Sequence, residues 1–330
     1  MSDPLRASVV GFGKMGMLHS SILGATPGVA LASIVEPQPL LRAFGPKGVG
    51  VPFRKSLAQA LRRDRPDLVY ITTPTGSHPA LAAQALAAGC AVFVEKPLGP
   101  TLAACEAVAR LAANRPAMVG YCKRFAPTFA HAHRLLAAGA IGEVRSFHGT
   151  ALVAQVFQGG TGWRYDRAAG GGALAVIGCH LVDLLRWFFG EPTAADGQGT
   201  AIHSAAVDDE FQGSLQFGTG LAGTFEVSWS RLGHRVLDTS LAVTGTQGTL
   251  TVTDDLVRIE GPRPALHHKQ ALAATVPLDL GAPEYGLETQ AFVAAVRAGQ
   301  DPPIPVADAY RTQALIDRLQ ASRPLARRAA

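Results

Sequence analysis

A glycine-rich hexapeptide directly after the first apolar run constrains this chain more than any other stretch. The run Ala7–Val10 leads into Gly11-Phe12-Gly13-Lys14-Met15-Gly16, which has the spacing G-x-G-x-x-G. In such a loop the first glycine permits a tight turn, the second lets the backbone approach a pyrophosphate, and the third lets a helix pack closely on the sheet. The N–H groups at the start of that helix point at the phosphates. The stretch therefore predicts a strand, a phosphate-binding turn and a helix.

A second apolar run supports a dinucleotide site. Val29–Val35 ends in Glu36, which lies twenty positions after Gly16. An acid at this distance binds the hydroxyls of the adenosine ribose. Glu36 would also repel a 2′-phosphate, and Arg42 is the only cation close by in the sequence. The pattern predicts that NAD is preferred over NADP.

Strands and helices alternate as far as residue 123. The expected strands after Val35 are 67–73, 91–94 and 118–121, and the expected helices are 17–24, 56–63, 79–88 and 101–114. Regular alternation with short connections predicts a doubly wound parallel sheet. Residues 1–123 are therefore expected to form an α/β dinucleotide-binding domain of the Rossmann type.

Beyond residue 124 the expected strands follow one another without helices between them. They are 144–156, 203–217, 222–230, 237–244 and 249–259. The expected helices are 127–138, one running from the glycines 170–172 to Phe189, 284–298 and 306–320. Consecutive strands joined by hairpin turns predict a large, mostly antiparallel open sheet. Residues 124–330 are expected to form an α/β domain for substrate binding and oligomerisation.

Composition excludes several classes of protein. With 330 residues, 48% hydrophobic and 17% charged, the chain predicts two well-packed domains rather than disorder. The basic residues behind the net charge of +5 are scattered or terminal and are not interleaved with aromatic residues, which argues against nucleic-acid binding. No signal peptide or membrane span is expected, and the four cysteines, without metal-ligand spacing, indicate a cytoplasmic protein with no metal site.

Two side chains could move a proton beside a nicotinamide. Lys96 follows the apolar run Ala91–Val94 in Glu95-Lys96-Pro97, at a strand end where a parallel sheet binds its ligands. His180 lies in a predicted helix and exchanges a proton near neutral pH. Position alone also allows a surface lysine and a buried core histidine, so both interpretations stay open at this point.

Seven short motifs, in this order along the chain, resemble those of the Gfo/Idh/MocA oxidoreductases. They are Gly11–Gly16; Thr73-Pro74 with His78; Glu95-Lys96-Pro97; Gly120-Tyr121 with Arg124-Phe125; Ile141–Val144; Trp163-Arg164 with Gly170–Gly172; and Gly178-Cys179-His180 with Asp183. The similarity extends from the first strand to about Pro305. It implies a Rossmann domain followed by an open α/β domain, and homodimers or homotetramers built on the open sheet. It further implies NAD(P)-dependent oxidation or reduction of sugars, cyclitols or similar secondary alcohols, with Lys96 and His180 as the reacting pair.

The resemblance and the motifs together give a predicted site. The predicted cofactor contacts are Gly11, Phe12, Gly13, Lys14, Met15, Gly16, Glu36, Thr73, Pro74, His78, Glu95, Lys96 and Arg124. The predicted substrate contacts are Lys96, Tyr121, Gln155, Trp163, Arg164, Val176, Cys179 and His180.

One position departs from the family pattern. Many catalytic members carry an aspartate four residues before the histidine, where this chain has Val176. Valine accepts no hydrogen bond, so either His180 works with Lys96 alone or another group substitutes. Asp183 and Asp166 are nearby in the sequence, but the sequence alone does not show whether either of them takes the place of the missing aspartate.

We therefore expect an NAD-dependent dehydrogenase acting on a secondary alcohol of a sugar, amino sugar or cyclitol, including an aminocyclitol of a specialised biosynthetic pathway. The alternatives are a reductase of a keto-sugar or imine, and a catalytically silent NAD-binding regulator. Retention of Lys96 and His180 favours an enzyme, whereas Val176 favours the regulator.

Overall fold

The computed structural model describes residues 3–42, 50–273 and 283–328, which form two compact units. The first contains the chain up to Tyr121 and the C-terminal segment that ends at Arg311, and the second contains the segment from Cys122 and the chain from Thr312 onward. The C-terminal segment thus returns to the first unit, whereas the sequence analysis assigned every residue after 123 to one domain.

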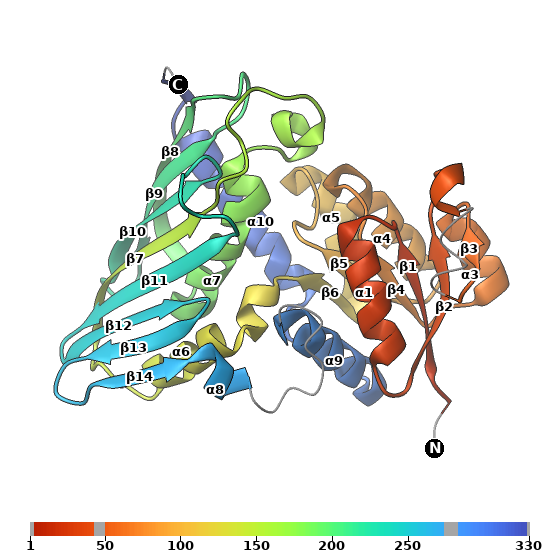
Figure 1. The fold of residues 1–330 in the computed structure, drawn as a ribbon, viewed down its shortest axis with the longest axis horizontal. Coiled ribbons are helices and arrows are strands. Elements are labelled where there is room, and N and C mark those ends of the chain that lie inside the picture. The colour runs from red at the N-terminus through yellow and green to blue at the C-terminus, as the bar shows by residue number, and fades with distance from the viewer. Residues whose placement is uncertain (1–2, 43–49, 274–282, 329–330) are drawn as a thin grey trace. The chain divides into compact units, whose positions relative to one another are not determined.

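The first unit is built on a six-stranded sheet in which every strand is parallel (Figure 1). The strand order is β3-β2-β1-β4-β5-β6, with bounds β1 Leu5–Val10, β2 Val29–Val35, β3 Phe53–Arg54, β4 Leu68–Ile71, β5 Ala91–Glu95 and β6 Ala117–Gly120. The order reverses between β1 and β4, and ligands of such sheets bind at the carboxyl ends of the strands beside that point. The predicted doubly wound parallel sheet is confirmed.

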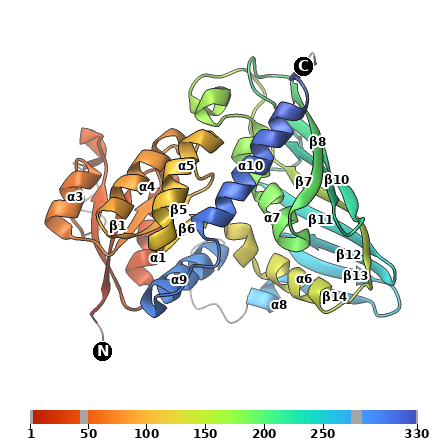
Figure 2. The same ribbon diagram turned by 180° about the vertical axis from the view of Figure 1, so that it is seen from behind.

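Helices cover both faces of this sheet. One face carries α1 (Lys14–Ala25) and α9 (Pro283–Ala298), which pack against each other (Figure 1). The other carries α3 (Leu57–Asp64), α4 (His78–Ala87) and α5 (Leu102–Leu111), as Figure 2 shows. The side chain of Thr101 accepts a hydrogen bond from the backbone N–H of Ala104 and so caps α5.

The second unit is built on a nine-stranded sheet. The strand order is β14-β13-β12-β11-β7-β10-β9-β8-β15, with bounds β7 Val144–Leu152, β8 Pro192–Ala201, β9 Glu210–Phe217, β10 Ala222–Ser228, β11 Asp238–Gly245, β12 Gly248–Thr253, β13 Leu256–Glu260, β14 Ala265–His268 and β15 Ala326–Arg327. Among the described strand pairs of this second sheet, only β7 with β10 and β8 with β15 are parallel. The prediction of a mostly antiparallel sheet is confirmed.

Helices pack on one face of the second sheet (Figures 1 and 2). They are α6 (Pro127–Ala137), α7 (Cys179–Phe189), and the part of α10 (Val306–Ser322) from Thr312 onward, with the short α8 (Lys269–Ala273) beside α6. A π-helical segment, Leu174–Gly178, precedes α7. The segment Arg167–Phe189 is long and apolar enough in composition to cross a membrane, but 89% of its most apolar window is buried, as in the core helix of a folded domain.

Two of the expected strands differ in extent from those observed, and β8 is an observed strand that was not expected. The strand expected from residue 203 begins at Glu210, because the Asp209 carboxylate accepts the N–H groups of residues 202 to 204 and turns the chain. The expected strand 249–259 is a hairpin of β12 and β13. β8 was not predicted, because its sequence is rich in small residues and lacks an apolar alternation.

Candidate active site

The glycine loop joins β1 to α1 in the first unit. Gly11 has φ of 95°, in the region that favours glycine, and its carbonyl oxygen accepts a 3.0 Å hydrogen bond from the hydroxyl of Thr72. A Cβ on Gly16 would lie 2.0 Å from that same carbonyl oxygen. Gly16 is therefore required for the close packing of α1 against the turn.

Gly13 has a different role from Gly16. It is the N-cap of α1, its φ is −79°, and none of the described atoms lies within 4 Å of the position that a Cβ would take. The N-cap residue makes no side-chain hydrogen bond to the first backbone N–H groups of α1, and the space beside its Cα is open. This is the geometry that a pyrophosphate requires, so the loop fits the dinucleotide predicted from the sequence.

The two glycines are expected to respond differently to alanine. Gly13→Ala meets no steric clash and should lower the free energy of unfolding by about 1 kcal/mol or less, while raising the Kd for NAD at least ~10-fold because the methyl group occupies the pyrophosphate position. Gly16→Ala should instead destabilise the fold. Urea unfolding and titration calorimetry measure both effects. Equal loss of stability in the two variants would contradict this account of the loop.

Glu36 lies at the carboxyl end of β2 and is held by two backbone groups. Its Oε2 accepts the N–H of Phe12 at 3.0 Å, and its Oε1 accepts the N–H of Gln38 at 2.9 Å. Each oxygen keeps a second lone pair for a ribose hydroxyl. Arg42, the nearby cation, donates to the carbonyl oxygens of Glu36 and Pro37.

We expect NAD to bind roughly tenfold or more tightly than NADP, because the Glu36 carboxylate repels a 2′-phosphate. Titration calorimetry with both dinucleotides measures the difference, and Glu36→Gln should narrow it. Equal or tighter binding of NADP to the unaltered protein would show that Glu36 does not select the cofactor.

His78 ties together two turns at the carboxyl ends of β4 and β5. Its Nδ1 lies 2.9 Å from the carbonyl oxygen of Pro97 and its Nε2 lies 2.6 Å from that of Thr73. Burial lowers the pKa of His78, although the two carbonyl oxygens oppose that shift. The structure thus brings Thr73, Pro74 and His78 together with the Lys96-Pro97 turn, and their contact with NAD remains a prediction.

Lys96 follows β5 directly. Its backbone N–H donates a 3.1 Å hydrogen bond to Glu95 Oε2, while Glu95 Oε1 lies 2.8 Å from His19 Nε2. Lys96 itself is partly exposed, whereas Glu95 and His19 are buried. The lysine therefore leaves the parallel sheet at the carboxyl end of a strand, the edge where such sheets bind ligands, on a backbone that a buried carboxylate holds.

In the second unit, the helical segment that ends at Phe189 carries three of the predicted residues. Val176 lies about one turn before Cys179 and His180. Val176 and His180 are each 6% exposed and Cys179 is fully buried. Val176 belongs to the π-helical segment, whose wider turns occur frequently at functional sites. Because Lys96 belongs to the first unit and His180 to the second, their action as a pair remains a prediction.

Asp208 fixes the start of this segment. Its Oδ2 accepts the N–H of Leu174 at 2.7 Å, and its backbone carbonyl oxygen accepts the N–H of Ala173. Burial raises the pKa of Asp208 to about 6. A Cβ on Gly172 would lie 2.4 Å from Asp208 Oδ1, which explains the glycine at that position.

Arg124 and Asp183 form a buried bidentate ion pair. Arg124 Nε and Nη2 donate to the two Asp183 carboxylate oxygens at 2.7 and 2.6 Å, and the Thr312 hydroxyl donates to Asp183 Oδ1 at 3.2 Å. The Arg124 guanidinium also lies 6.0 Å from the centroid of the Trp187 ring. The structure thus places Arg124 against the helix that carries His180, and its predicted contact with the cofactor is not tested by this geometry.

The remaining predicted substrate residues have varied environments. Gln155 and Arg164 are exposed on the chain between β7 and the helical segment, and Trp163 is half-buried with the Arg164 guanidinium 5.6 Å from its ring centroid. Tyr121, at the end of β6, is fully buried. Asp166 caps a short 3₁₀ turn by accepting the N–H of Ala168.

Sequence reasoning missed several polar residues around the candidate site. They are Thr72, which supports the glycine loop, Asp208, which holds the helix start, and His19 and Glu288, which lie beside Glu95. His19 and Glu288 are ionisable residues on the buried sides of α1 and α9. Because those sides also carry Ser20, Glu284 and Thr289, the sequence pattern does not single these two residues out.

Comparison with protein families gives two matches. Residues 5–122 match the model described as an oxidoreductase family with an NAD-binding Rossmann fold, GFO_IDH_MocA, and residues 129–251 match the GFO/IDH/MocA C-terminal domain. The two matches follow each other along the chain, and they cover the six-stranded sheet and the strands β7 to β11 of the nine-stranded sheet. The predicted cofactor, NAD, is confirmed by the N-terminal match.

Similar proteins include named dehydrogenases. The chain is 27% identical to scyllo-inositol 2-dehydrogenase (NAD(+)) of Bacillus subtilis over 76% of this chain and 75% of the relative. It is 28% identical to levoglucosan dehydrogenase of Pseudarthrobacter phenanthrenivorans over 74% of this chain and 73% of the relative. Among solved structures, an oxidoreductase domain protein from Kribbella flavida is 25% identical and has a TM-score of 0.87, with 97% of each chain covered.

Proposed function

Since the chain belongs to the Gfo/Idh/MocA family of NAD-dependent oxidoreductases, we propose that it transfers a hydride between NAD and a secondary alcohol of a sugar, amino sugar or cyclitol. The observation that carries the proposal is the position of Lys96. It stands at the carboxyl end of β5 in an NAD-binding sheet, with its backbone hydrogen-bonded to the buried Glu95. The named relatives, which include inositol and levoglucosan dehydrogenases, support the substrate class.

The proposed chemistry divides between the cofactor and the chain. The chemistry that NAD supplies when bound is hydride transfer. His180 takes the proton of the substrate hydroxyl as the carbonyl forms, and Lys96 donates a hydrogen bond to the same oxygen and orients it. The glycine loop and Glu36 hold the dinucleotide, so that the nicotinamide meets the Lys96 end of the sheet.

Two alternatives use the same site. The reverse reaction would reduce a keto-sugar or an imine, with His180 and Lys96 returning the proton. A silent NAD-binding regulator would need neither residue, although Val176 in place of an acid is consistent with it. Incubation with NAD and a panel of polyols and amino sugars, followed by absorbance of the reduced cofactor, separates an enzyme from a regulator.

Val176 makes the proposed enzyme selective. If this side chain faces the substrate, a hydroxyl buried against it would lack a partner and cost about 1 to 3 kcal/mol. We therefore expect inositol and glucose to be poor substrates compared with a deoxy sugar, amino sugar or aminocyclitol. Val176→Asp should raise kcat/KM for plain polyols or lower it for the natural substrate. A variant with neither change would show that position 176 does not contact the substrate.

The proposed enzyme is cytoplasmic and assembles as a homodimer or homotetramer through the open face of the nine-stranded sheet. Helices pack on only one face among the described elements, and the other face exposes His148, Gln212 and Thr224. Light scattering coupled to size exclusion measures the assembly.

A further inference from the structure

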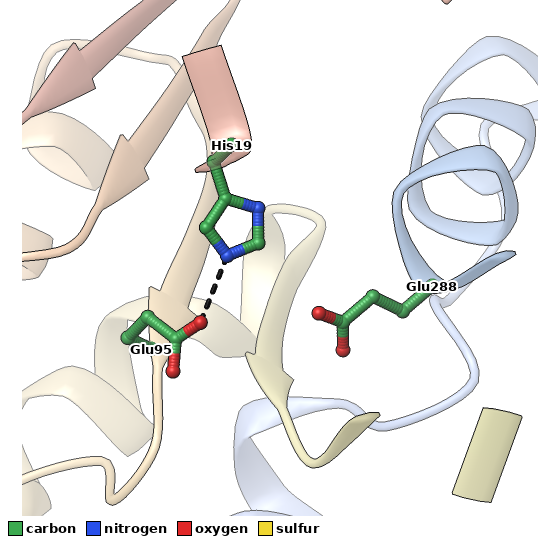
Figure 3. Close-up of side chains that lie close together, drawn as sticks. All are labelled: His19, Glu95 and Glu288. Atoms are coloured by element: carbon green, nitrogen blue, oxygen red, sulfur yellow. Dashed lines mark hydrogen bonds and ion pairs between the residues drawn. The ribbon is translucent and has the colours of Figure 1, made fainter. Parts of the chain in front are cut away.

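Three ionisable side chains meet inside the first unit, away from solvent. His19 comes from α1, Glu95 from the end of β5 and Glu288 from α9, and Figure 3 shows the Glu288 carboxyl group facing the other two. One polar atom of each lies within 4.8 Å of those of the other two. His19 and Glu288 are fully buried and Glu95 is 6% exposed. The proposed catalytic pair includes none of them.

The two carboxyl groups are not equivalent. Glu95 has a hydrogen-bond donor at each oxygen, His19 Nε2 at 2.8 Å and the Lys96 backbone N–H at 3.1 Å. Neither oxygen of Glu288 has a hydrogen-bond partner among the described residues, although both are buried. Two carboxyl groups this close do not both ionise, and hydrogen bonds favour the charged form of the group that accepts them. Glu288 is therefore the carboxyl group of the two that holds a proton.

Apart from the His19 imidazole, the described residues place no cationic side chain in a hydrogen bond or ion pair with Glu288. The His19 ring packs against Tyr70 and Phe93, with centroids 5.6 and 5.1 Å apart, and against Tyr285. The other titratable groups at this place are the phenol of Tyr70 and a further carboxyl group, Glu284, one turn before Glu288 on α9. Burial, Glu95 and Glu284 all raise the pKa of Glu288 well above its usual range.

We propose that Glu288 is a positioning residue, and that its carboxyl group holds a proton in the folded protein and faces the carboxyl group of Glu95. His19 holds Glu95 by a hydrogen bond, the neutral Glu288 adds no second negative charge beside it, and Glu95 in turn accepts the backbone N–H of Lys96. The consequence for Lys96 rests on the proposed function, whereas the proton on Glu288 does not.

A bound divalent metal ion is the alternative that the test must distinguish. The observed 2.8 Å between His19 Nε2 and Glu95 Oε1 is a direct hydrogen bond. Tetrahedral zinc ligands, about 2.0 Å from the ion, lie roughly 3.3 Å from one another. The observed contact thus favours a proton over a metal ion.

The first measurement is urea unfolding of three proteins from pH 5 to 9. They are the unaltered protein, the Glu288→Gln variant and the Glu106→Gln variant. A proton bound only in the folded state makes stability fall as pH rises from the unfolded pKa to the folded pKa. The unfolding constant of the unaltered protein should therefore rise about tenfold per pH unit relative to that of Glu288→Gln, in which an amide replaces the acid. Glu106, an exposed carboxylate of the same unit, is the matched control, and its variant should keep the slope of the unaltered protein.

The second measurement is kcat with the best substrate of the panel. Glu288→Leu removes the polar group and should lower kcat about tenfold with little change in KM, because a displaced Lys96 still binds the substrate but orients its hydroxyl poorly for proton transfer. Glu288→Gln should recover most of that loss, which a merely structural role would not predict. If no substrate is turned over, the proposed function fails, while the unfolding slopes still decide whether Glu288 holds a proton.

Two results would overturn the proposal. One is a pH-independent ratio of unfolding constants between the unaltered protein and Glu288→Gln. The other is a stoichiometric metal ion in the purified protein by mass spectrometry that Glu288→Gln removes, which would make the three side chains a metal site. Equal kcat in Glu288→Leu and the unaltered enzyme would overturn the positioning role alone.

Discussion

Lys96→Ala and His180→Ala are each expected to lower kcat by roughly 100-fold or more, the usual effect of removing a positioned acid or base. Lys96 stands at the strand end where the nicotinamide is expected, and His180 is the one histidine on α7. The Kd for NAD should change little in either variant, because Gly13 and Glu36 hold the other end of the dinucleotide.

Matched controls separate chemistry from folding. Lys55 is an exposed lysine directly after β3 of the same sheet, and His268 is an exposed histidine at the end of β14. Alanine at either position should leave kcat within about twofold of the unaltered enzyme. Near-normal turnover by Lys96→Ala at saturating substrate would remove Lys96 from the mechanism, and a parallel loss of NAD binding would indicate a structural effect.

Asp183→Asn is expected to lower the free energy of unfolding by about 3 to 5 kcal/mol, because it leaves the Arg124 guanidinium without its countercharge. The Asp183 side chain is 1% exposed and that of Arg124 is 9% exposed, so solvent cannot replace the lost partner. The substitution should also disturb the position of His180, since Asp183 lies one turn further along α7. Urea unfolding at neutral pH measures the loss.

An exposed pair provides the comparison for Asp183. Arg145 and Glu143 are paired at 2.8 Å but each side chain is at least 60% exposed, and Glu143→Gln should change stability by less than about 1 kcal/mol. A small effect of Asp183→Asn would mean that the Arg124 pair does not stabilise the second unit. Arg124→Met then tests the predicted cofactor contact, because a rise in the Kd for NAD without unfolding would support it.

The parts of the fold that the sequence predicted are those in which local pattern and structure agree. Gly11–Gly16, Val29–Val35 and the alternating segments up to residue 123 gave the parallel sheet, because strand, turn and helix are encoded by neighbouring residues. The requirement for glycine at position 16 could also be stated in advance, since it depends on the absence of one Cβ, whereas the role of Gly13 stays a prediction.

What the sequence did not predict depends on contacts between distant residues. Glu288 lies 193 positions after Glu95, and the packing of α9 on α1 brings it to the first unit. Asp209 likewise ends an expected strand early by accepting the N–H groups of residues 202 to 204. The π-helical turn at Val176 could not be foreseen, because an apolar run is compatible with both helix types.

The central claim is that this chain catalyses hydride transfer with NAD, and turnover in both directions tests it most directly. The unaltered protein and Lys96→Ala are mixed with NAD and a panel of cyclitols, sugars, amino sugars and deoxy sugars, or with the reduced cofactor and keto-sugars. Absorbance of the reduced nicotinamide is followed. We predict turnover of at least one modified ring compound by the unaltered protein, lowered roughly 100-fold in Lys96→Ala. Tight NAD binding with no turnover of any compound in either direction would contradict the claim and identify a regulator.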